Sequence, residues 1–182
     1  VLMAGADPNY RRARSPNGPD DCSALDRACT ASVSNADASA AVRLLCNAGV
    51  DVNETHTVLR GKDDDTSPLL HAASKAKATV VEVLLSAGAK PHYRRTHEEG
   101  LPDDSSALDL VCRDTHMKDV GAVCDIVRLL CDAGLDPNAT PTMMGGRTND
   151  TSPLMTAADQ EELALVEALL LVGANPHCRR TH

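Results

Sequence analysis

The chain has 182 residues, a formal net charge of −8 and 42% hydrophobic residues. This acidic balance excludes a broad cationic face, so we expect neither nucleic acid nor a membrane surface as a partner. The chain holds two Tyr and neither Phe nor Trp, so a core must be built from Leu, Val and Ala, which favours small, closely packed helices over a sheet.

One phrase recurs along the chain. AGADPNYRR occupies 4–12, and it returns as AGAKPHYRRTH at 87–97 and as VGANPHCRRTH at 172–182. Residues 48–97 align without a gap over 133–182, an offset of 85 residues, with 26 identical residues among 50. A large unit has therefore been duplicated. An internal repeat of this kind is typical of repeat architectures and is the strongest indication of the fold class.

Each large unit contains two predicted helix pairs. Segments such as SPLLHAA (67–73) predict short first helices, because Ser is a good N-cap residue and Pro suits the first helical position. A leucine pair followed by Gly after two or three further residues predicts the end of each second helix, because Gly adopts the left-handed stop conformation there. We expect helix pairs near 23–50, 67–89, 106–135 and 152–174. The leucine pairs at 44–45, 84–85, 129–130 and 169–170 are expected to be buried between them.

These motifs together resemble the ankyrin-repeat family, whose signature is T-P-L-H-x-A followed by a second helix ending in L-L-x-x-G-A-D-x-N. The resemblance covers essentially the whole chain. It implies an all-α repeat solenoid of stacked helix pairs joined by β-hairpin fingers, in which the loop residues Asn53 and Asn138 brace the turn into the next finger. The implied divisions are a partial repeat and finger at 1–22, repeats at 23–66, 67–105 and 106–151, and a repeat ending in a truncated finger at 152–182.

Several departures from the family are regular. The spacings between successive loop positions are 44, 39, 46 and 39 residues, whereas a standard repeat is about 33 residues. These positions are Asn9, Asn53, His92, Asn138 and His177. Each finger is therefore expected to be longer than usual. The longer repeats carry extra residues at 30–39 and 113–122, which we expect to be loops, and Asp26 and Asp109 stand where the family has His. We interpret the single array 1–182 as an interior section of a longer one.

Signals for catalysis or metal binding are poor. The run Asp63 to Asp65 is better explained by the positive end of a helix dipole than by a cation. The His and Cys residues of the recurring phrase form no closed four-ligand set for zinc. Cys29, Cys46, Cys112 and Cys131 occupy small-residue positions on helices and are expected to be buried. The sequence thus predicts no catalytic residue, no cofactor and no metal site.

The fingers supply the candidate binding residues. Arginine pairs recur in every second finger, and apolar pairs occupy the expected hairpin tips between them. The candidates are Arg11, Arg12, Arg94, Arg95, Arg179 and Arg180, with Val58, Leu59, Met143 and Met144. The alternative remains open that the arginines pair with Asp runs of neighbouring fingers and that the apolar pairs pack finger to finger.

The resulting hypothesis is a non-catalytic protein–protein interaction scaffold that binds an elongated or acidic protein through finger tips and a concave helix face. The alternative is a targeting or regulatory segment of a larger enzyme, such as a ligase, kinase or acyltransferase. Seven cysteines without a C-x-x-C pair indicate a reducing, cytoplasmic setting, where cytoskeletal association would fit. We also expect the isolated segment to self-associate through uncapped ends.

Overall fold

The structure is a computed structural model that describes residues 7–10, 23–30, 34–54, 66–95, 105–113, 119–139 and 152–177. Over these residues the fold is helical, with two very short strands. The helices are α1 (Ala24–Thr30), α2 (Asn35–Asn47), α3 (Pro68–Ser74), α4 (Ala78–Ser86), α5 (Ala107–Cys112), α6 (Val120–Asp132), α7 (Pro153–Asp159) and α8 (Leu163–Leu171).

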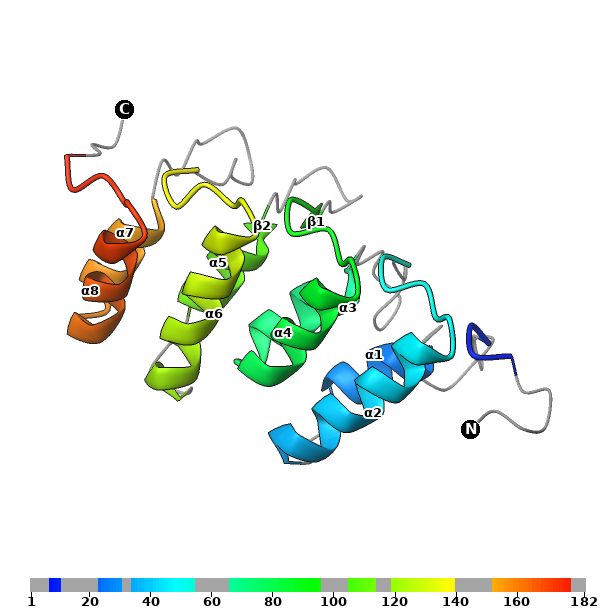
Figure 1. The fold of residues 1–182 in the computed structure, drawn as a ribbon. Coiled ribbons are helices and arrows are strands. Elements are labelled where there is room, and N and C mark those ends of the chain that lie inside the picture. The colour runs from blue at the N-terminus through cyan, green and yellow to red at the C-terminus, as the bar shows by residue number, and fades with distance from the viewer. Residues whose placement is uncertain are drawn as a thin grey trace, which may run out of the picture.

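The helices form four pairs that follow one another in a row (Figure 1). Helices α2, α4, α6 and α8 contact one another in turn, and α1, α3, α5 and α7 do the same in a second layer. All four pairs fall within the ranges expected from the sequence. Strand β1 (Arg94–Arg95) pairs antiparallel with β2 (Ser105–Ser106), so that Arg94 lies opposite Ser106. The predicted hairpin tips after Asn53 and Asn138 lie outside the described residues.

The first helices begin as their sequences predict. The Ser67 and Ser152 hydroxyls accept hydrogen bonds from the backbone amides of Leu70 and Met155, and each is followed by Pro at the start of its helix. In α1 the carboxylate of Asp26 accepts from the backbone amide of Ser23, while the Ser23 hydroxyl accepts from the Asp26 amide. Such a reciprocal capping box satisfies two backbone donors that the helix leaves free. Ser106 and Asp109 repeat it in α5.

The predicted loops at 30–39 and 113–122 are wrong in part. Residues 35–39 and 120–122 are helical and belong to the second helices, so that α2 and α6 have 13 residues each whereas α4 and α8 have 9. The reason is local capping. The Ser34 hydroxyl accepts from the amide of Asp37, and the Asp119 carboxylate accepts from the amide of Gly121. An N-cap of this kind stabilises a helix start by about 1 kcal/mol.

The prediction that both leucines of each pair are buried is also wrong in part. Leu84, Leu130 and Leu169 are fully buried, and Leu45 is half-buried, but Leu44 is 64% exposed and Leu170 is 44% exposed. The inward leucine always lies four residues before the helix-ending glycine, and its carbonyl accepts from the amide just after that glycine, as in Ala89 to Leu84 at 2.9 Å.

The glycine thus decides which leucine points inward. Gly88 has a φ of 91°, a left-handed conformation that glycine adopts readily. The hydrogen bond across it defines a Schellman stop, which is commonly accompanied by an apolar contact between the residue after the glycine and the inward leucine. The leucine pair lies one residue further from the glycine in α2 and α6 than in α4 and α8. The second leucine of the pair therefore points inward in α2 and α6, and the first leucine does so in α4 and α8.

Loop residues hold consecutive pairs together. The Asn53 side chain accepts from the amide of Lys90 at 2.8 Å and donates to the carbonyl of Gly88 at 3.1 Å. Asn138 makes the same two contacts one large unit later, with Asn175 and Gly173. The brace that the family resemblance implied at these two positions is therefore present. Asn9 accepts from the amide of Asp51 in the same way.

Candidate functional site

The structure places only part of the predicted binding surface. Arg94 and Arg95 form strand β1, where their backbone pairs with that of β2. The remaining candidates lie outside the described residues, so the predicted ladder of arginine and apolar pairs stays a prediction. These residues are Arg11, Arg12, Val58, Leu59, Met143, Met144, Arg179 and Arg180.

The outward surface of the second helices carries a regular pattern of charge. Counting from the helix-ending glycines, one equivalent position holds Arg43 in α2 and Glu82 in α4, and then Arg128 in α6 and Glu167 in α8. All four side chains are exposed. The sign therefore alternates from one second helix to the next, so that neighbouring second helices carry opposite charges at this position. Sequence inspection missed this alternation, although the positions of the glycines could have revealed it.

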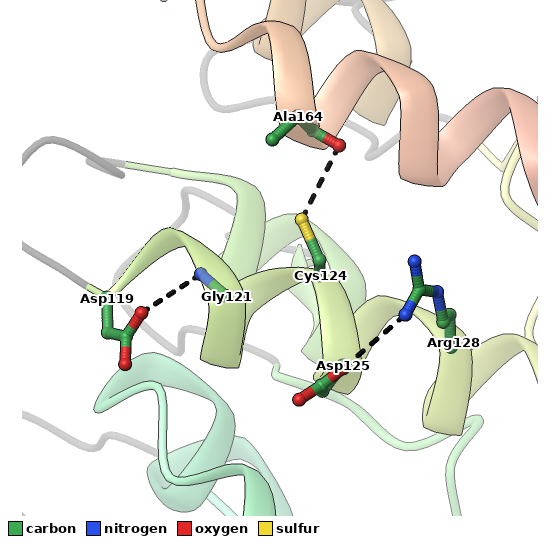
Figure 2. Close-up of polar contacts among 6 residues, drawn as sticks. All are labelled: Asp119, Gly121, Cys124, Asp125, Arg128 and Ala164. Carbon is green, nitrogen blue, oxygen red and sulfur yellow. Dashed lines mark hydrogen bonds and ion pairs between the residues drawn. The ribbon is translucent and has the colours of Figure 1, made fainter.

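A groove opens between α4 and α6, with a volume of about 340 Å³. Its walls are polar as well as apolar and consist of Ala78, Thr79 and Glu82 from α4 and Asp125, Arg128, Leu129 and Asp132 from α6. Arg128 lies 3.5 Å from Asp125 across one turn of α6 (Figure 2), and both side chains are more than half exposed. Such an exposed pair stabilises the fold by about 0–1 kcal/mol at most.

The formal charge of the groove is negative, because three carboxylates share it with one guanidinium. The groove can therefore accept a cationic side chain of a partner. Its lining was not among the residues predicted from the sequence, because it depends on which side chains of two different helix pairs face each other.

The contact between α6 and α8 differs from the contact between α4 and α6. Cys124 of α6 takes the place that Ala78 holds in α4, and its thiol donates a weak hydrogen bond to the carbonyl of Ala164 in α8 at 3.5 Å (Figure 2). The side chain is buried by α8, and burial raises the pKa of this thiol. Cys124 is thus a packing residue of the row rather than a reactive one.

The other described cysteines also serve packing. Cys29 and Cys112 are fully buried, as predicted, whereas Cys46 and Cys131 are half-buried. Burial, with the nearby charge of Asp26, raises the pKa of Cys29 to about 12, and burial raises that of Cys131 to about 11. A thiol with so high a pKa holds almost no thiolate at neutral pH, which is the form that acts as a nucleophile.

The outer face of α8 is apolar and uncovered. Leu163 is 70% exposed and Leu170 is 44% exposed, and Val166 between them is half-buried. The residues equivalent to Val166 in the three earlier second helices, which are Val42, Val81 and Val127, are fully buried. Since each of those helices is followed by another pair, the difference marks the surface that a following pair would cover.

Within the described ranges, no three His, Cys, Asp or Glu side chains lie together as a metal ion would require. Among the described helices, none combines the length and the apolar character needed to cross a bilayer. Neither a known protein-family model nor a curated protein sequence matches the chain.

Proposed function

We propose that this chain is a non-catalytic protein-binding scaffold of the ankyrin-repeat kind, a row of helix pairs whose outward side chains recognise a partner protein. The observation that carries the proposal is the contrast between inward and outward positions. Leu25, Leu69 and Leu108 occupy the same buried place in three first helices. The repeated frame thus holds a surface whose residues vary from one pair to the next.

The varied surface supports recognition by charge and by shape. The groove between α4 and α6 carries a formal charge of −2 on exposed side chains, whereas the predicted arginine pairs of the fingers are cationic. A partner long enough to contact both would carry basic and acidic segments at a matching spacing. Rigid frames favour such binding, because little conformational freedom is lost on association.

The experiment is affinity capture with the whole chain, followed by binding measurements with the purified partner. Three variants locate the surface. Glu82→Lys with Asp132→Lys reverses the groove, Arg94→Ala with Arg95→Ala removes one finger pair, and Arg27→Glu alters the first-helix layer. A saturable interaction weakened by at least one variant, with helicity unchanged, supports the scaffold. If no captured protein binds saturably in purified form, or if all three variants bind like the parent, the proposal fails.

A further inference from the structure

A second exposed apolar surface lies at the other end of the row, on α2. Leu44 of α2 is 64% exposed, and Ala41 beside it is exposed as well. The equivalent residues of α6, Leu129 and Ile126, are half-buried and fully buried. The α2 face that would receive a preceding pair is therefore open, as is the α8 face that would receive a following one.

The duplication shows which helix faces inside the row are equivalent to these two exposed faces. Residues 85 positions apart are equivalent, so α8 corresponds to α4 and α2 corresponds to α6. The α4 side of the established groove consists of Ala78, Thr79 and Glu82. The corresponding residues of α8 are Leu163, Ala164 and Glu167.

The α6 side of that groove converts in the same way. Asp125, Arg128, Leu129 and Asp132 correspond to Ala40, Arg43, Leu44 and Asn47 of α2, which are all exposed. Two of the three carboxylates in the α4–α6 groove are thereby replaced by Ala and Asn. One glutamate and one arginine remain, together with two leucines.

We propose that two copies of this chain associate head to tail, with α8 of one copy packed on α2 of the next as α4 packs on α6. Leu163 then meets Leu44, and Glu167 lies beside Arg43. The alternation of Arg43, Glu82, Arg128 and Glu167 along the row continues without interruption into the arginine of the second copy. The alternation of 13-residue and 9-residue second helices continues as well.

This contact joins two different faces, so it does not close on itself, and further copies can add at both ends. In sedimentation velocity, we expect the average mass of the parent chain to rise with concentration above the 19.2 kDa of one copy. Leu163→Ser and Leu44→Ser should each weaken association by about tenfold or more, as expected for apolar residues at the centre of a contact.

A mixture of these two variants provides the sharpest test. The Leu163→Ser chain keeps an intact α2 face, and the Leu44→Ser chain keeps an intact α8 face. One copy of each should form a dimer that cannot grow, at the concentration where each variant alone is a monomer. The matched control is Leu171→Ser, because Leu171 is 77% exposed on the same helix but occupies the place of Asp132, which faces the preceding pair.

A parent chain that stays monomeric at all concentrations would overturn the proposal, as would a mixture that contains only monomers. A control variant that weakens association as much as Leu163→Ser would point to unspecific stickiness and would also overturn it. The charge pair adds an independent measurement. Glu167→Arg and Arg43→Glu should each weaken association, because like charges then meet in the contact. A mixture of those two chains should recover it, since every contact between unlike chains pairs opposite charges, and one chain carrying both substitutions should recover it as well.

Discussion

The side-chain oxygen of Asn53 accepts a hydrogen bond from the backbone amide of Lys90, 37 residues further along the chain, at 2.8 Å. The same side chain donates to the carbonyl of Gly88, so one amide group ties together the loops that follow two consecutive helix pairs. The contact recurs from Asn138 to Asn175. These braces thus connect consecutive helix pairs through their loops.

Replacing Asn53 with Ala should lower the free energy of unfolding by about 1–2 kcal/mol, because a donor and an acceptor in the next loop lose their partner. Urea unfolding followed by circular dichroism measures this change. Asn47→Ala is the control, since Asn47 is an exposed helical residue and Ala favours helix. Equal unfolding midpoints for Asn53→Ala and the parent would show that the brace contributes no stability.

The positive-φ positions predict two opposite effects. Gly49 has a φ of 86°, and an added Cβ would meet nothing within 4 Å. Gly49→Ala should therefore cost about 1–2 kcal/mol through backbone strain alone.

Glu161 carries a comparable φ of 58°, and its side chain is exposed. Glu161→Gly should for that reason stabilise the fold, by about 1 kcal/mol. Chemical unfolding of both variants against the parent tests the pair, and a loss of stability in Glu161→Gly would contradict the account.

The distance to the helix-ending glycine gives two adjacent leucines of α8 different degrees of burial. Leu169 is fully buried, whereas Leu170 is 44% exposed. Leu169→Ala should destabilise the fold by about 2–5 kcal/mol, as a cavity in a close-packed core does. Leu170→Ala should cost less than about 1 kcal/mol, as exposed positions do. Similar losses for the two variants in thermal unfolding would show that the glycine does not decide which leucine points inward.

Alkaline conditions should weaken the fold through Cys29. Its pKa rises from the ordinary value of 9.0 to about 12 because the folded chain buries the thiol. The folded state then holds this proton more tightly than the unfolded state does, so the contribution is fully present below pH 9 and is lost as the pH rises toward 12. From about pH 7 to about pH 10 the parent should lose roughly 1 kcal/mol more stability than Cys29→Ala does. Parallel urea titrations at the two values measure this, and identical losses would contradict it.

Much of this fold could be predicted from the sequence because its signals are local. Ser67 followed by Pro68 specifies a helix start, and Gly88 specifies a helix end, whatever surrounds them. The inward leucine could not be chosen from the leucine pair alone, because the choice depends on the distance to the glycine. The start of α2 could not be placed from the sequence, because Ser34 and Asp37, which form its cap, are polar residues that suit a loop equally well.

The candidate surfaces were harder to predict. The groove between α4 and α6 depends on side chains such as Glu82 and Asp132 that are 50 residues apart in the chain. Their proximity follows only once the helix pairs are placed beside one another. The predicted finger residues were chosen because arginine and apolar pairs recur in the sequence, and recurrence says nothing about which of them face a partner.

The regularity of the row is the central claim, and spin-label distances test it most directly. Labels introduced as unnatural amino acids at positions 43 and 128, and in a second sample at 82 and 167, join exposed sites two steps apart along the second helices. Packed helices lie about 10 Å apart, so the two labelled sites of each sample should be about 20 Å apart. Both samples should therefore give narrow distance distributions, and the label side chains should add the same length to each. Two distributions with the same mean would support a row built from a duplicated unit. A broad distribution, or means that differ by about one helix spacing of 10 Å, would contradict it.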